Sequence, residues 1–112
     1  MNAYPKHIKR KLNDLAAQAY ELELGRELDR LFHQFEAWKA GQISANELND
    51  LIHKHHNGPS RELYSKYANV EAGLLVAYAL VSGLLPQDSV PEEVWPYLQR
   101  ELAFYQAQAK RE

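Results

Sequence analysis

The chain of 112 residues carries 13 Lys and Arg against 15 Asp and Glu, and its formal net charge of −2 argues against a protein that coats nucleic acid over its whole surface. Hydrophobic residues make up 46% and charged residues 25%, which is the composition of an ordinary globular chain rather than a disordered one. There is no cysteine, so disulfides, thiolate metal sites and a cysteine nucleophile are excluded. We expect one domain, residues 1–112, in a reducing compartment, the cytoplasm, since no secretory signal is recognisable.

A long first helix is predicted for residues 5–40. Its apolar residues recur at helical spacing in two series, which are Ile8, Leu12, Leu15, Ala19 and Leu22, then Leu24, Leu28, Leu31, Phe35 and Trp38. The second series starts two residues late and therefore lies about 200° around the helix. The change at Gly25 indicates either a kink or a helix that changes partners, and we favour the unkinked helix. Because such a helix is about 50 Å long, part of it is expected to meet a second subunit, which favours a homodimer.

The next helix is predicted to begin at Ala45. Ser44 can cap it, Glu47 can return the bond, and Ile43 can pack on Leu48 across the cap. The sequence Asn57-Gly58-Pro59 predicts its end, with a left-handed glycine and a proline that prevents continuation.

Pro59 and Ser60 are predicted to open a short helix through Tyr67, in which Glu62 and Lys66 form a local ion pair. Asn69 is predicted to cap an apolar helix at residues 70–82. A last helical segment follows Pro91, with a kink or restart near Trp95 because of Pro96.

The resulting fold class is all-α, an irregular bundle of about five helices packed around the buried apolar helix. The longest uncharged apolar run, residues 72–85, is shorter than the roughly 20 residues that a membrane-spanning helix needs. We therefore expect no membrane association.

No catalytic set is recognisable. Caps or helices account for four serines, Ser44, Ser60, Ser65 and Ser82, the glycines are isolated from one another, and there is no threonine. We expect a protein that is not an enzyme, without catalytic residues and without a cofactor.

Basic side chains mark a candidate binding site for anions or nucleic acid. A cationic cluster occupies the first turns of the first helix, where positive charge opposes the helix dipole and invites a phosphate or an acidic partner. A second group lies at the predicted helix start after Gly58, where free backbone N–H groups can bind an anion. The candidate residues are Lys6, Lys9, Arg10, Lys11, His56, Ser60 and Arg61.

A metal site at His53 and His56 is a weaker alternative. The two imidazoles lie three residues apart, so both can reach one ion, but no carboxylate completes the set. We prefer a different explanation, in which these histidines interact favourably with the end of the helix dipole, and a contact with a partner or an anion is a further alternative. We predict no metal.

Aromatic residues favour a protein-binding surface. The chain has seven tyrosines and two tryptophans, and these side chains suit both the margin of a core and an interface. The candidate partner-binding residues are Arg26, His33, Trp38, Tyr64 and Tyr67. The sequence thus predicts a small regulator, adaptor or antitoxin- or immunity-type protein that binds another protein, a second copy of itself included.

Overall fold

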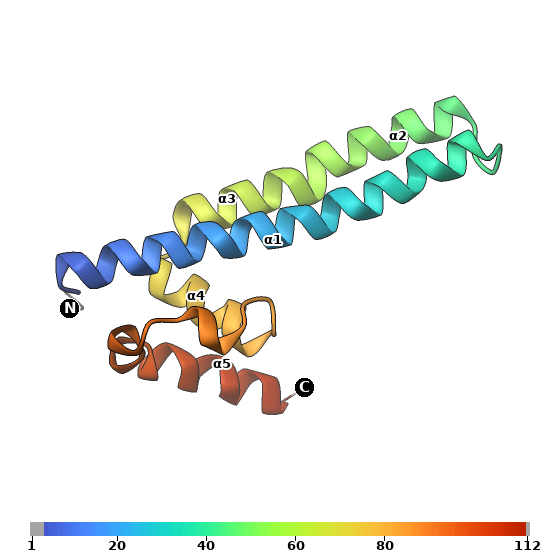
Figure 1. Ribbon diagram of the computed structural model, residues 1–112. Coiled ribbons are helices and arrows are strands. Elements are labelled where there is room, and N and C mark those ends of the chain that lie inside the picture. Colours follow the sequence, from blue (N-terminus) through green and yellow to red (C-terminus); the bar gives the residue numbers. More distant parts are fainter. Residues whose placement is uncertain (1–3, 112) are drawn as a thin grey trace.

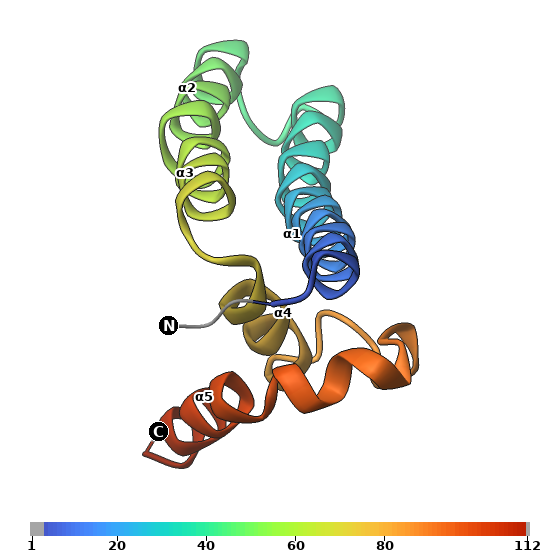
Figure 2. The same ribbon diagram turned by 90° about the vertical axis from the view of Figure 1, so that its left-hand side faces the viewer.

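The computed structural model describes residues 4–111 and is all-α (Figures 1 and 2). In chain order the elements are α1 (Lys6–Lys39), α2 (Ala45–His55), η1 (His56–Ser60), α3 (Arg61–Asn69), α4 (Ala72–Val81), η2 (Gln87–Ser89), η3 (Glu92–Tyr97) and α5 (Gln99–Arg111). The predicted bundle of about five helices with a long first helix is confirmed. Helix α1 runs without interruption through Gly25, so the unkinked alternative is the correct one.

The hydrophobic core lies at one end of the molecule. The first half of α1 contributes Ile8, Leu12, Leu15, Ala16 and Ala19, while α4, the following loop, η3 and the start of α5 contribute the rest, including Leu75, Val76, Val94 and Leu98. These side chains are almost fully excluded from solvent. The predicted apolar helix is therefore buried, and α1 and α5 form its main neighbours.

The second half of α1 projects from this core as one arm of a helical hairpin. Helices α2 and α3 run back along it as the other arm, so that the molecule measures 53 × 31 × 24 Å (Figure 1). The bundle is irregular, as predicted: α1 and α5 pack on α4, whereas α2 packs on the far part of α1.

The hairpin turn follows the sequence prediction. Gly41 has a φ of 77°, which an L-residue with a side chain adopts only with strain, and it reverses the chain after α1. The Ser44 hydroxyl accepts a hydrogen bond from the Glu47 N–H, and the Glu47 carboxylate accepts one from the Ser44 N–H, both at 3.0 Å. This reciprocal cap confirms the predicted start of α2 at Ala45.

The predicted break at Asn57-Gly58 is wrong. Helical geometry continues from α2 through η1 into α3, and within residues 4–111 only Gly41 and Gly83 have positive φ. Element η1 is a π-helical turn that contains Pro59. Proline lacks an N–H and its ring collides with the carbonyl four residues back in an α-helix, so the wider turn lets the chain remain helical.

The predicted cap at Asn69 is also wrong. Its side-chain amide donates a hydrogen bond to the Ser65 carbonyl oxygen at 2.8 Å, and Glu71 occupies the residue before α4. The predicted restart near Trp95 is confirmed, because η3 ends at Tyr97 and α5 begins at Gln99. Among residues 4–111, the structure contains no helix with the length and hydrophobicity that a membrane span requires.

Candidate functional site

A row of large apolar side chains is exposed on the projecting part of α1. Leu28 is 49% exposed, Phe32 58%, Phe35 38% and Trp38 37%. Three of these belong to the second apolar series of the sequence, whereas Phe32 lies just outside it. Such a contiguous run is unusual on the surface of a soluble helix and is typical of a binding surface. We call Leu28, Phe32 and Phe35 the apolar face of α1.

The core cannot cover this face. At 100° per residue, the direction of Leu28 and Phe32 lies about 150° around α1 from the direction of Leu12 and Leu15, which enter the core. Helices α2 and α3 contact a third side of α1, where Glu27 and Leu31 face Leu51 and Pro59 across a groove. The apolar face is therefore left without a covering element in the part of the chain that the structure describes.

A cluster centred on Glu23 connects the hairpin to the core. The Glu23 carboxylate accepts hydrogen bonds from the Tyr67 hydroxyl at 2.6 Å and from the Lys66 ammonium at 2.8 Å. The same ammonium lies 4.1 Å from the ring centre of Tyr78 on α4, a favourable cation–π contact. Burial, followed by the hydrogen bond to Glu23, raises the pKa of Tyr67. The predicted Glu62–Lys66 pair is thus replaced by an ion pair between α3 and α1.

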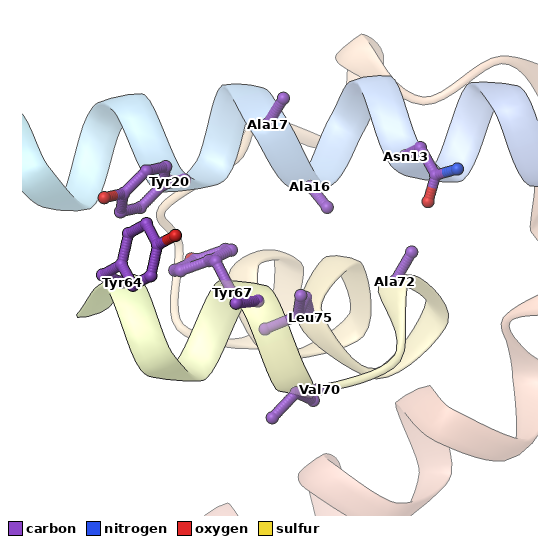
Figure 3. A pocket seen from close by; sticks show the side chains of 10 residues that line it. Asn13, Ala16, Ala17, Tyr20, Tyr64, Tyr67, Val70, Ala72 and Leu75 are labelled. Carbon is purple, nitrogen blue, oxygen red and sulfur yellow. The ribbon is translucent and has the colours of Figure 1, made fainter. Parts of the chain in front are cut away.

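A tyrosine-lined groove of about 460 Å³ opens between α1 and α3. Tyr20 and Tyr64 lie at one end, Asn13 and Ala72 at the other, and Leu75 lies at the base (Figure 3). The rings of Tyr20 and Tyr67 are 5.0 Å apart, while Tyr64 is 68% exposed. The lining residues include no carboxylate, imidazole, Lys or Arg, so the groove offers apolar walls and phenol hydroxyls rather than acid–base groups.

The basic candidates do not converge. Lys6, Lys9 and Arg10 are exposed on the first turns of α1, whereas Lys11 forms an ion pair with Glu93.

The other members of that candidate group are distant. His56, Ser60 and Arg61 flank Pro59, which lies beside Glu27, about 24 Å along α1 from Lys11 at 1.5 Å per residue. Since the helix continues through η1, the free helix start that motivated an anion site at Ser60 and Arg61 does not exist.

The histidine candidates lie at the surface. His53 and His56 are both exposed, and no group of three or more His, Asp or Glu that could hold a metal ion occurs among residues 4–111. His33 pairs with Glu36 at 2.9 Å, also on the surface.

The partner-binding candidates fall into two places. Arg26, His33 and Trp38 lie along the projecting part of α1, and Arg26 lines a groove of about 420 Å³. That groove carries charges of both signs, and Arg30 forms an ion pair with Glu27 and Lys66 one with Glu23. Tyr64 and Tyr67 instead line the tyrosine groove.

The sequence interpretation missed a second buried contact. The Tyr4 hydroxyl donates a hydrogen bond to Glu101, which is only 7% exposed, at 3.2 Å. Burial, and then the Glu101 charge, raise the pKa of Tyr4 to about 12. Nothing in the local sequence signals a contact between residues 97 positions apart.

Comparisons of the chain with models of protein families, with curated proteins and with solved structures find no match.

Proposed function

We propose that this protein acts by binding protein, beginning with a second copy of itself, and that it carries out no catalysis. The single observation that carries the proposal is the exposure of Leu28, Phe32 and Phe35 on one side of a helix that projects from the core. A regulator, an adaptor or an antitoxin- or immunity-type protein would act in this way.

Energetic considerations support the proposal. Burying a Leu or Phe side chain stabilises a structure by about 1.5–3 kcal/mol relative to leaving it in water. Three such residues in one row therefore provide a driving force comparable with that of a small interface centre, where a few buried aromatic and aliphatic anchors dominate the binding energy. The surrounding charged residues, among them Asp29 and Glu36, supply the polar rim that interfaces have.

A binding role also fits the chemistry of the grooves. The tyrosine groove contains no general acid or base that titrates near neutral pH, and its tyrosines favour recognition by shape and hydrogen bonding. In the charged groove beside Arg26, the carboxylates of Glu27 and Glu23 are paired with Arg30 and Lys66, so neither carboxylate is presented as a free base.

Sedimentation equilibrium over the micromolar range tests the proposal. We expect reversible self-association, which the substitution Phe32→Ser weakens at least tenfold, the equivalent of about 1.4 kcal/mol. The matched control is Phe104→Ser, because Phe104 is similarly exposed, at 51%, but lies on α5. A strict monomer at the highest attainable concentration would refute self-association.

Anion or nucleic-acid binding at the start of α1 is the second candidate. The observation that favours it is the exposed trio Lys6, Lys9 and Arg10, with no acidic residue in the first turn to balance it. Binding of labelled duplex or single-stranded nucleic acid should fall steeply as salt rises, and Lys9→Gln with Arg10→Gln should weaken it. Failure of all nucleic acids to bind at low salt would exclude this candidate.

A further inference from the structure

We infer that two copies of this chain pair through their α1 helices, which lie antiparallel about a two-fold axis at the level of Arg30. The inference rests on the proposed self-association and specifies its geometry. It follows from the placement of four positions around the apolar face: Glu21, Gly25, Phe35 and Lys39.

Viewed down the axis of α1, Leu28 and Phe32 lie on either side of the middle of the apolar face, because they are four residues apart. Glu21 and Lys39 are about five full turns apart and therefore point in the same direction as the middle of the face, one toward each end. The apolar centre is thus flanked along the helix by one negative and one positive charge.

An antiparallel pairing satisfies both charges at once. With the axis at Arg30, Leu28 lies level with Phe32 of the partner subunit, and Glu21 lies level with Lys39 of the partner subunit. The symmetry repeats each contact, so two opposite-charge pairs flank the apolar layers. A parallel pairing in register would place Glu21 against its own copy and Lys39 against its own copy, which is repulsive.

The same arrangement accounts for Gly25. Glycine weakens a helix interior relative to alanine, and in this monomer nothing requires it, because its φ is not positive and a Cβ there would meet no atom within 4 Å. In the antiparallel pair Gly25 lies level with Phe35 of the partner subunit. A residue without a side chain leaves the space that a phenyl ring needs in that layer.

The rest of the molecule leaves room for the second copy. The core end with α4 and α5 lies on the opposite side of α1, and α2 and α3 lie on the third side. The pairing also brings the end of the partner's α1, at residue 40, level with residue 20, which lines the tyrosine groove.

Disulfide cross-linking tests the orientation, since the chain has no cysteine of its own. Glu21→Cys chains mixed with Lys39→Cys chains are expected to form a covalent dimer on mild oxidation, whereas neither variant alone should do so. Cross-linking of each variant with itself would overturn the antiparallel arrangement while leaving self-association intact. A monomer in sedimentation, with no cross-link in any mixture, would overturn both the antiparallel arrangement and self-association. The apolar face would then be a binding surface for a different protein.

A charge exchange provides an independent test. Glu21→Lys should raise the dissociation constant of the dimer about fivefold by replacing two attractive pairs with two repulsive ones, and Glu21→Lys with Lys39→Glu should restore it to within about twofold. Asp88→Lys is the control, because it makes the same charge change at an exposed site on η2. Lack of rescue in the double variant contradicts the pairing of Glu21 with Lys39.

Gly25→Ala separates the two roles of this residue. Helix propensity predicts that it stabilises the isolated fold, which thermal unfolding at low concentration measures. The antiparallel pairing predicts that it weakens association at least threefold, because the methyl group occupies the space of the phenyl ring of Phe35 of the partner subunit. A gain in both stability and association would overturn the assignment of Gly25 to the interface.

Discussion

At the scale of single residues, two carboxylates that accept hydrogen bonds from tyrosines hold distant parts of the chain together. Glu23 accepts from Tyr67, which joins α1 to α3, and Glu101 accepts from Tyr4, which joins the N-terminal end to α5. A hydrogen bond to a charged acceptor in a partly buried site is worth more than an exposed one, because water competes less for it. We therefore expect the first contact to hold the two arms of the hairpin together, and the second to hold the start of the chain on α5, more strongly than a surface ion pair would.

Removing the Tyr67 hydroxyl should destabilise the fold. Tyr67→Phe is expected to lower the free energy of unfolding by about 1–2 kcal/mol, since Glu23 keeps Lys66 but loses its shortest hydrogen bond. Urea denaturation measures this. Tyr64→Phe is the matched control because Tyr64 is the most exposed tyrosine of the groove, and an equal loss in both variants would contradict the role of the Glu23 contact.

The fold should be sensitive to alkali through the same tyrosines. The pKa of Tyr4 is raised from 10.0 to about 12 in the folded protein, and that of Tyr67 is raised as well. A raised folded-state pKa contributes stability that is complete below pH 10.0 and is lost as the pH rises through the folded value, here from about 10 to 12. Urea denaturation between pH 9 and 12 should show this loss, and the double variant Tyr4→Phe, Tyr67→Phe should lose less over the same range. Parallel slopes for the two proteins would contradict it.

At the scale of elements, periodicity predicts helices well but not always their ends. The two apolar series of α1, the capping box of α2 and the apolar stretch of α4 were readable because each is a local pattern. The continuation of helical structure through Gly58 and Pro59 was not readable from the sequence. Local composition alone indicates a break there, whereas in the structure η1 is a π-helical turn that packs against α1.

Helix α4 should dominate stability. Leu75 is 3% exposed, and Leu75→Ala is expected to cost about 2–5 kcal/mol through lost burial and the cavity left behind. His53→Ala, on the exposed side of α2, should cost far less. Chemical denaturation of the two variants measures both, and the reverse order would mean that the core lies elsewhere.

At the scale of the whole molecule, a core at one end and a hairpin arm at the other give an extended shape. The radius of gyration is 17.4 Å, against about 13 Å for a compact domain of this size. An arm of two helices has little interior of its own and leaves one side of each helix to solvent or to a partner. The extended shape therefore makes the apolar face available for association.

Self-association should lengthen the particle. The two α1 helices overlap only over residues 21–39, about 27 Å, so the longest dimension should rise from 53 Å to about 80 Å. Small-angle X-ray scattering over a concentration series measures this change. Association without lengthening would indicate that the two copies lie side by side over their whole length, which contradicts the inferred arrangement.

The helical class, the length of α1, the start of α2 and the apolar character of α4 were all predictable, because each is encoded in spacings of a few residues. Which apolar series is buried was not predictable in this way. Periodicity states that one side of a helix is apolar, but whether another element covers that side depends on chain segments far away in sequence. For the same reason, the hydrogen bonds of Glu23 and Glu101 were not predictable from the sequence. Leu28, Phe32 and Phe35 likewise have the spacing of core residues, and only the positions of α4 and α5 show that they are exposed.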